Sequence, residues 1–352
     1  MQSTMSHVGT RSDTAPTAWS REISRTVAAS AALLLASLLF LVARPVAAQS
    51  LVLDQRIELP SVEGRIDHMD VDADGGRLFV AALGAGSLEV VDLRAGKRMA
   101  RIAPLREPQG VTYVPAMRRL FVAEGAGARV GAYADGKAPI VSSAGDLDDA
   151  DNLRFDPAAN QLVVGYARAL AFLDPNTLRL VRRIELAGHP EAFELEHTGG
   201  RIFVNVPSAG HVAVVDRSSG KVSATWNLVG ASRNFAMALD EPNHRLFVAT
   251  RQPAQMLVYD TGTGKRTVAI PICGDADDLF FDGQRRQLYA VCGEGVVDVI
   301  RQRDPDHYEI AQHIPTSSGA RTGLFVPGRA TLFVAAPSRG GSSAEIRAYK
   351  VQ

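Results

Sequence analysis

Along most of this chain, short apolar stretches alternate with clusters of glycine, aspartate and other turn-forming residues, and one apolar triplet keeps returning. Six of its seven copies are a Leu or Ile followed by an aromatic or aliphatic residue and then Val, and successive copies begin 40 to 44 residues apart. They begin at Leu78, Leu120, Leu162, Ile202, Leu246, Leu288 and Leu332. A period of about 40 to 45 residues built from short strands is typical of a β-propeller with one four-stranded blade per copy. The pattern therefore predicts an all-β, seven-bladed propeller.

Within the first copy, β-rich runs predict strands at residues 68–71, 77–82, 87–92 and 98–103, separated by Gly- and Asp-rich turns. The second run is almost entirely apolar, which is expected of a strand that packs against neighbouring blades on both faces. An aspartate ends the third strand in four copies, at Asp92, Asp174, Asp216 and Asp260. Its carboxylate is expected to accept hydrogen bonds from turn amides, so we assign it a structural role.

The two ends of the repeat array predict how the ring closes. The seventh copy stops after its third strand, at residues 345–351, and an unassigned strand at residues 51–59 precedes the first copy. We expect this N-terminal strand to complete the last blade, since pairing the two termini removes both open sheet edges.

The first 48 residues have the pattern of a secretory signal. Arg21 and Arg25 precede an apolar run at residues 27–43, and Ala47 and Ala48 offer small residues for cleavage after Ala48. A retained anchor stays open as an alternative, although this run is short for a membrane span. The sequence thus predicts a signal at residues 1–48, a single propeller at 49–352, and a periplasmic or secreted location.

Composition narrows the classes of partner. The whole chain is formally neutral, with 38 basic and 38 acidic side chains. It lacks the broad basic field that non-specific nucleic-acid binding uses, which argues against a nucleic-acid partner. No second apolar stretch approaches spanning length, so no membrane contact beyond the signal is expected. We expect a monomer.

Two cysteines, Cys273 and Cys292, fall in the sixth copy. In an exported chain they meet an oxidising compartment, where disulfides persist. A turn at residues 283–286 would place Cys292 opposite Asp277, so the loop carrying Cys273 must fold back for the sulfurs to meet. A disulfide and a pair of buried thiols both remain open.

Several segments resemble the YVTN-type propeller repeat. They include Gly188-His189-Pro190, followed by Arg201-Ile202-Phe203-Val204 and Val212-Ala213-Val214-Val215-Asp216. The resemblance covers residues 51–352 and points to the YncE-type periplasmic propellers. It implies the fold but no particular activity. Single-stranded DNA binding has been proposed within that family, and the neutral charge and few aromatic residues argue against it here.

The innermost strands of a propeller surround its channel, and their first residues break the repeat. Aligned starts read Asp67, Gln109, Asp151, Glu191, Phe235, Asp277 and Arg321, and the next positions include His68, Asn152 and Asp278. Arg233 and Asn234 stand just before Phe235. The candidate ligand-binding residues are therefore Asp67, His68, Asp151, Asn152, Glu191, Arg233, Asn234, Asp277, Asp278 and Arg321.

Three interpretations of this ring remain. In the first, polar residues line a water-filled channel and connect neighbouring blades by hydrogen bonds, since buried polar groups need partners. They also suit a small-molecule or peptide site at the channel mouth, where arginines would pair with anionic groups. The third interpretation is a calcium site made by Asn152, Glu191, Asn234 and Asp278, with His68 as a base or ligand. That set resembles, in residue type only, the site of gluconolactonase- and paraoxonase-type hydrolases.

The sequence contains no nucleophile elbow, zinc-protease motif or phosphate-binding glycine loop. It therefore predicts an exported binding or scaffold propeller with no cofactor, whose partner is a small molecule or a protein. A calcium-dependent hydrolase or lyase is the alternative.

Overall fold

The computed structural model describes residue 9 and residues 51–134, 139–142 and 146–352. The predicted signal at residues 1–48 and its cleavage site lie outside these residues, apart from Gly9. Within the described part, no helix is long and apolar enough to cross a bilayer.

The fold consists almost entirely of short antiparallel strands. In chain order they are β1 (Leu51–Leu59), β2 (Met69–Asp72), β3 (Arg77–Ala82), β4 (Ser87–Asp92), β5 (Lys97–Ile102), β6 (Pro108–Val114), β7 (Arg119–Glu124), β8 (Arg129–Ala134), β9 (Pro139–Ser142), β10 (Leu153–Asp156), β11 (Gln161–Tyr166), β12 (Ala169–Leu173), β13 (Leu180–Glu185), β14 (Phe193–Leu195), β15 (Arg201–Val206), β16 (His211–Asp216), β17 (Lys221–Asn227), β18 (Ser232–Asp240), β19 (Arg245–Gln252), β20 (Ala254–Asp260), β21 (Arg266–Pro271), β22 (Ala276–Asp282), β23 (Gln287–Cys292), β24 (Val296–Asp304), β25 (His307–Pro315), β26 (Thr322–Val326), β27 (Thr331–Ala336) and β28 (Ala344–Val351). Among the described residues, four single-turn 3₁₀ helices connect strands, at Leu83–Ala85, Pro115–Met117, Pro207–Ala209 and Pro327–Arg329.

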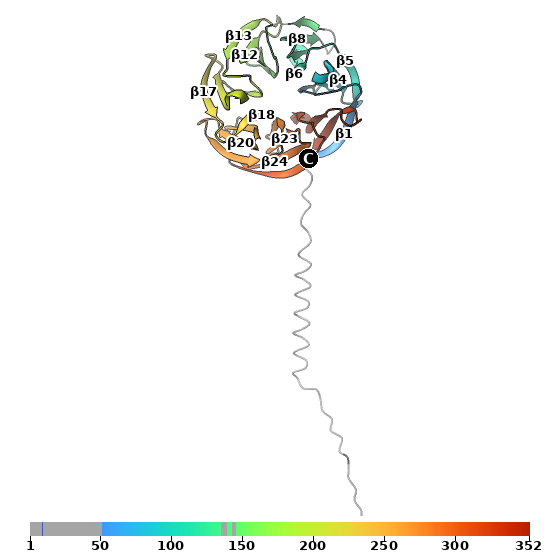
Figure 1. The fold of residues 1–352 in the computed structure, drawn as a ribbon, viewed down its shortest axis with the longest axis vertical. Coiled ribbons are helices and arrows are strands. Elements are labelled where there is room, and N and C mark those ends of the chain that lie inside the picture. Colours follow the sequence, from blue (N-terminus) through green and yellow to red (C-terminus); the bar gives the residue numbers. More distant parts are fainter. Residues whose placement is uncertain (1–8, 10–50, 135–138, 143–145) are drawn as a thin grey trace, which may run out of the picture. The chain divides into compact units, whose positions relative to one another are not determined.

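These strands form seven four-stranded sheets over the described residues, and the sheets stand around a common centre as blades (Figure 1). Blades 1 to 6 each use four consecutive strands, beginning with β2, β6, β10, β14, β18 and β22. Blade 7 has the order β1-β28-β27-β26. The predicted seven-bladed propeller is confirmed.

The ring closes through the N-terminal strand. β1 pairs antiparallel with β28, with Leu51 opposite Val351 and Leu59 opposite Ala344. Leu51, Ile57 and Leu59 are fully buried, so β1 adds core as well as covering an edge. The predicted closure by residues 51–59 therefore agrees with the structure.

The second strand of each blade is apolar because both of its faces are buried. In β3, Leu78 and Val80 pack against blade 7, while Phe79 and Ala81 pack against blade 2. Successive side chains of a strand point to opposite faces, so burying both faces leaves no polar alternation in the sequence. This packing explains why the triplet recurs in every blade.

The predicted turn role of the recurring aspartate is also seen. Asp92 Oδ1 accepts hydrogen bonds from the amides of Arg94 and Ala95, each at 2.8 Å. Asp216 Oδ1 likewise accepts one from the Ser219 amide at 2.7 Å. The carboxylate thus replaces backbone partners in the turn after the third strand.

Cys273 and Cys292 are joined in a disulfide, with their Cα atoms 5.9 Å apart. Cys292 pairs with Ala276 and not with Asp277, because the register shifts between Ala276 and Asp278. A bulge of this kind inserts one residue into one strand, and a uniform count from the turn misses it. The bond ties the loop before β22 to the end of β23.

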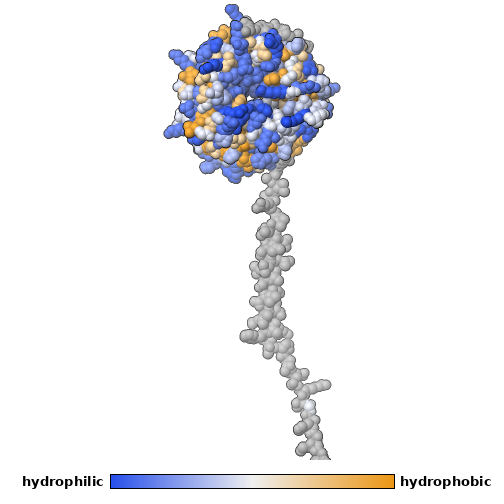
Figure 2. Space-filling model, in the orientation of Figure 1, coloured by the Kyte–Doolittle hydropathy of each residue, from blue (hydrophilic) through white to orange (hydrophobic). Residues whose placement is uncertain are grey.

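Most neighbouring innermost strands contact one another closely around the channel, β10 and β14 being the exception, and the innermost strands all begin at the same end of it. We call that end the upper mouth and the opposite end the lower mouth. Hydrophilic residues gather around the hollowed centre of the ring in the space-filling view (Figure 2).

Candidate functional site

The upper mouth is built by residues at or just before the starts of the inner strands. Asp67 and His68 precede β2, Asp151 and Asn152 precede β10, and Glu191 lies two residues before β14. Asp277 and Asp278 lie within β22, and Arg321 directly precedes β26. Ring closure therefore brings together residues that are distant in sequence.

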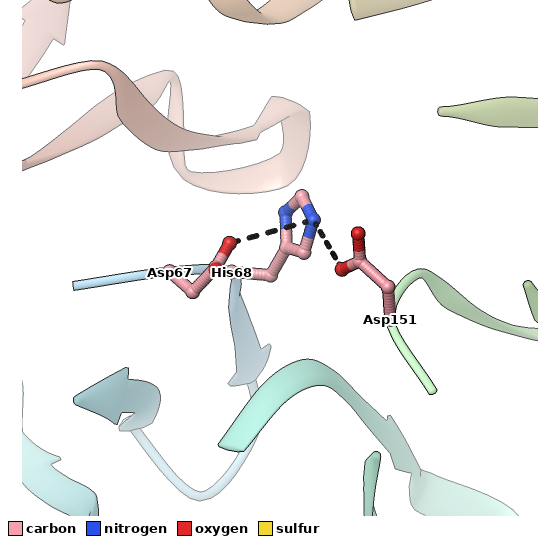
Figure 3. A group of neighbouring side chains, drawn as sticks. All are labelled: Asp67, His68 and Asp151. Atoms are coloured by element: carbon pink, nitrogen blue, oxygen red, sulfur yellow. Dashed lines mark ion pairs between the residues drawn. The ribbon is translucent and has the colours of Figure 1, made fainter. Parts of the chain in front are cut away.

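One cluster joins blades 1 and 3 across the channel. His68 Nε2 lies 3.7 Å from Asp67 Oδ1 and 3.7 Å from Asp151 Oδ1, and the imidazole stands between the two carboxylates (Figure 3). On the other side of the imidazole, His68 Nδ1 is 3.9 Å from Asp278 Oδ1. The second oxygen of Asp278 accepts a hydrogen bond from the Gly323 amide at 2.8 Å, which fixes its orientation.

A second cluster joins blades 5, 6 and 7 through alternating charges. Arg251 contacts Asp277 Oδ1 at 2.5 Å and Asp275 Oδ1 at 3.1 Å, and its guanidinium stacks 3.8 Å from the centroid of the Phe235 ring. Asp275 also pairs with Arg321 at 2.9 Å. These groups hold one another in place, which satisfies part of the mouth without any ligand.

Arg65 links the two clusters. Its Nη2 lies 2.9 Å from Asp67 Oδ2 and 4.0 Å from Asp277 Oδ2. The closer contact is an ion pair without the alignment of a hydrogen bond, since Asp67 Oδ2 is buried and receives no aligned donor. Half of the Arg65 side chain is exposed, so solvent weakens this pair.

Blade 4 contributes His189 and Glu191. His189 Nδ1 lies 3.2 Å from the Ala167 carbonyl oxygen and 3.3 Å from Asp149, and its Nε2 is 3.9 Å from Asp151. Glu191 differs from the other mouth residues. In the described part of the chain, no hydrogen bond or ion pair engages its half-buried carboxylate.

Burial and crowding shift the acid–base behaviour of this mouth. Burial, together with Asp151 and Asp277, raises the pKa of Glu191 to about 7. Burial also raises the pKa of Asp67, although His68 opposes the shift. For His68, burial alone would lower the pKa, but Asp67, Asp278 and Asp151 outweigh it and raise the pKa. The carboxylates here are thus held closer together than their charges favour.

Several sequence candidates lie elsewhere or have other partners. Arg233 is exposed. Asn234 is fully buried, and its Nδ2 donates to Asn205 Oδ1 at 2.8 Å and to the His211 carbonyl at 3.1 Å, both in blade 4. Asn152 is buried, and its Oδ1 has no hydrogen-bond partner among the described residues. The acidic and histidine residues gathered most tightly are Asp67, His68 and Asp151, which is not the calcium set expected from the sequence.

Blade 2 offers no charged side chain at the equivalent position because the backbone there is too close to its neighbour. A Cβ on Gly110 would lie 2.1 Å from the Asp151 carbonyl oxygen. Only glycine permits this approach of β6 to the start of β10. The close approach positions Asp151 at the mouth.

Sequence reasoning missed Arg65 and Arg251. Arg65 lies in the loop before β2, outside the aligned strand starts. Arg251 lies near the end of β19, a second strand, and a signal for it was present. Five copies of the repeat have a small or turn-forming residue there, at Gly125, Ala167, Pro207, Gly293 and Pro337. Arg251, a long cationic side chain at a position that most copies use for a turn, therefore stands out as a residue with a role outside the repeat.

A cavity of about 600 Å³ lies at the lower mouth between blades 4 and 5. Glu241 lies in its wall and accepts hydrogen bonds from the amides of His197, Thr198 and Gly199 at 2.7 to 2.9 Å. The Thr198 hydroxyl donates to the same carboxylate at 2.5 Å. Burial opposes ionisation, but these four donors lower the pKa of Glu241 to about 2.

Comparison with known proteins supports a β-propeller without settling the activity. A glutamine cyclotransferase family model matches residues 160–262, which is less than a third of the chain. The chain is similar to the hydrazine synthase of Kuenenia stuttgartiensis, with a TM-score of 0.71 and 16% identity over 83% of this chain and 97% of that one. It is also similar to a chain in the crystal structure of a mitotic checkpoint complex, with a TM-score of 0.71 and 13% identity over 88% of this chain and 95% of that one.

At these identities the likeness to the solved structures shows the fold alone. No curated protein matches the sequence.

Proposed function

We propose that this protein is an exported binding propeller that takes up a small, positively charged organic ligand at its upper mouth. The observation that carries the proposal is the Glu191 carboxylate, which is half-buried at the start of an inner strand and has no protein partner among the described residues. Partial burial penalises an ionised carboxylate that has no protein partner, and a bound cation would offset that penalty.

The charge balance of the mouth favours a cation. Seven carboxylates belong to the described clusters, against the three guanidiniums of Arg65, Arg251 and Arg321. The carboxylates are Asp67, Asp149, Asp151, Glu191, Asp275, Asp277 and Asp278. The raised pKa values of His68 and His189 favour their protonated forms, and counting them with the exposed Arg233 leaves seven carboxylates against six cations, an excess of one negative charge. An ammonium group beside Glu191 would therefore be attracted, whereas a phosphate backbone would be repelled.

The raised pKa of Glu191 is a further support. Perturbed carboxylates cluster at functional sites, because a ligand can relieve the repulsion that folding imposes. Structural ion networks also perturb pKa values, and Asp151 and Asp277, which belong to such networks, contribute to the pKa shift of Glu191, although the Glu191 carboxylate itself makes no hydrogen bond or ion pair among the described residues.

Export and family membership remain part of this proposal. The N-terminal 48 residues carry the signal pattern, and the Cys273–Cys292 disulfide suits an oxidising compartment. The repeat segments support membership of the YVTN-type, YncE-like propellers. Completion of blade 7 by the chain's own N-terminal strand supports a monomer, since the ring closes without a strand from a second copy.

Binding is tested by calorimetry and thermal shift with primary amines of increasing size, each compared with its N-acetylated form. The amines should raise the melting temperature of the wild-type protein and the acetylated forms should not. Glu191→Gln should weaken amine binding by about tenfold or more, the loss expected for one charge-assisted contact. Glu58→Gln, the same change at an exposed site on β1, should leave binding unchanged. Equal affinity for acetylated and free amines would refute the proposal.

The family-model match favours a second candidate, an activity of the glutamine cyclotransferase type. Residues 160–262 include Glu191, and a carboxylate with a pKa of about 7 suits proton transfer near neutral pH. An N-terminal glutamine also carries an ammonium group. Incubation with a glutamine-initiated peptide should then release ammonia, and Glu191→Gln should abolish the release. Binding without ammonia release would leave the first proposal alone.

A further inference from the structure

Three potential metal ligands converge on the blade 1 side of the upper mouth. Asp67, His68 and Asp151 each offer one donor atom, and these atoms all lie within 4.8 Å of one another. The imidazole of His68 lies between the two carboxylates (Figure 3). Two of the residues are adjacent in sequence, and the third comes from blade 3, so ring closure alone creates the group.

The separations suit a shared metal ion better than hydrogen bonds. His68 Nε2 is 3.7 Å from both Asp67 Oδ1 and Asp151 Oδ1. Hydrogen bonds of this type have lengths of about 2.7 to 3.2 Å. Two ligands on a tetrahedral zinc ion, with bonds near 2.1 Å, are separated by about 3.4 Å. An ion between these groups therefore needs only small side-chain adjustments.

Burial supplies an independent observation. Asp151 is 7% exposed and Asp67 only 1%. Asp151 Oδ1, the oxygen nearest His68 Nε2, is buried and has no hydrogen-bond partner among the described residues. Each unpartnered oxygen in a protein interior requires an explanation, and an ion bound by both carboxylates provides one.

The surrounding groups match the usual support of a metal ligand. A metal-binding histidine generally presents its other ring nitrogen to a carboxylate or carbonyl. Here Nδ1 of His68 faces Asp278 Oδ1 at 3.9 Å, and the Gly323 amide anchors the other Asp278 oxygen. The remaining oxygen of Asp67 lies 2.9 Å from Arg65, and that of Asp151 lies 3.9 Å from His189. These contacts are electrostatic, since the 3.9 Å separations are longer than hydrogen bonds and Asp67 Oδ2 receives no aligned donor.

We propose that Asp67 Oδ1, His68 Nε2 and Asp151 Oδ1 bind one divalent transition-metal ion of the zinc class. A nitrogen donor with two carboxylates favours such an ion over calcium, which prefers oxygen ligands alone. Three protein ligands leave a coordination position for water or a bound molecule. This site lies in blades 1 and 3, apart from Glu191 in blade 4, and does not depend on the organic ligand.

Metal uptake is measured directly. The purified protein is stripped with EDTA, dialysed against Zn²⁺ or Ca²⁺, and examined by elemental mass spectrometry. The wild-type protein should retain one zinc ion per chain and no stoichiometric calcium. His68→Gln and Asp151→Asn should each weaken zinc binding by about 100-fold or more, and Asp278→Asn by about 10- to 100-fold. Co²⁺ in place of zinc should give a visible absorption band that His68→Gln removes.

His307→Gln is the matched control. It removes an exposed histidine that pairs with the single carboxylate of Asp304 at 2.8 Å, and zinc uptake should stay at one ion per chain. Circular dichroism and melting curves establish that each variant is folded. The graded effect of Asp278→Asn guards against a mere folding defect in the ligand variants. No stoichiometric zinc uptake by the wild-type protein, or equal uptake by folded His68→Gln, overturns the proposal.

Amine titrations repeated in EDTA separate this proposal from the previous one. Amine binding that persists in EDTA, without zinc uptake, supports the ligand site and overturns the metal site. Zinc uptake without amine binding does the reverse.

Discussion

Two glutamates on inner-strand segments of this propeller have opposite environments at its two mouths. Glu191, at the upper mouth, has no hydrogen-bond or ion-pair partner among the described residues, and its pKa is raised to about 7. Glu241, at the lower mouth, accepts four hydrogen bonds from residues 197–199, and its pKa is lowered to about 2. The same side chain is therefore a structural connector at one mouth and an uncompensated charge at the other.

The difference teaches how a repeat frame separates stability from function. At Glu241 the amides of a neighbouring turn stabilise the ionised carboxylate and join blades 4 and 5. At Glu191 burial and like charges destabilise the ionised form. A fold retains an unfavourable charge most readily where a ligand uses it, since strained and unsatisfied groups concentrate at functional sites.

The largest test removes the frame on which the comparison depends. Deleting residues 51–59 opens the ring and removes the fully buried Leu51, Ile57 and Leu59. Each such side chain contributes about 1.5–3 kcal/mol, so the loss approaches the total stability of about 5–15 kcal/mol for a typical domain. Aggregation or a lost unfolding transition is expected in calorimetry and size-exclusion chromatography. A well-behaved monomer with unchanged melting would contradict the closure.

Removing the Cys273–Cys292 disulfide tests whether this bond stabilises the upper mouth. Cys273→Ser with Cys292→Ser opens a link between residues 19 apart, which stabilises by about 3 kcal/mol in the loop-entropy account. The melting temperature should fall by about 5 °C. Asp275 and Asp277 follow directly on the released loop, so amine affinity should fall too, while the Glu241 contacts persist. Reductant added to the wild-type protein should reproduce the fall, and an unchanged melting temperature would count against it.

Glu191→Gln sharpens the comparison through the sign of its effect. A carboxyl group whose folded pKa lies above its ordinary value of 4.5 destabilises the fold progressively as pH rises from about 4.5 through 7. Glu191→Gln has no ionisable group at this position, so its stability does not fall for this reason as pH rises. At pH 8 it should be more stable than the ligand-free wild-type protein by on the order of 1–3 kcal/mol, or about 2–6 °C in melting temperature. Near pH 4 the two should melt together, and a destabilised variant at pH 8 would reverse our assignment.

Glu241→Gln should give the smallest effect and the opposite sign. Its folded pKa lies below 4.5, so its stabilisation is present above about pH 4.5 and is lost as pH falls toward 2. Because solvent reaches this carboxylate, we expect a loss of only about 1 kcal/mol at pH 7, seen as a melting temperature lower by a few degrees. The difference from wild type should shrink between pH 4.5 and 2.5. A constant difference across that range would argue that the charge is irrelevant.

The sequence predicted the frame well because the frame follows local rules. The predicted strands at residues 77–82 and 87–92 coincide with β3 and β4, and the turn after β4 uses Asp92 as expected. The pairing of Cys292 was wrong by one residue. The shift between Ala276 and Asp278 arises from tertiary packing and leaves no mark in the hydrophobic pattern.

For the candidate site, the sequence identified residues that lie near the channel but not the side chains that they contact. Aligning strand starts identified Asp67, His68 and Asp151 as neighbours of the channel, yet it could not show that His68 faces both carboxylates. The alignment of strand starts did not identify Arg251, because this residue reaches the mouth from the second strand of its blade. Such contacts depend on side-chain direction and on the distance between blades, and the repeat length of the sequence predicts neither.

By itself, then, the sequence determined the number of blades, the apolar second strands, the turn aspartates and the strand that closes the ring. Each of these follows from alternation, turn chemistry or repeat length, which act within one blade or between chain neighbours. Only the tertiary structure decided which polar residues meet at the upper mouth. Asp67 and Asp151 become neighbours because the ring closes and Gly110 lets two inner strands approach. Their environment is thus a property of the closed ring and not of any one repeat.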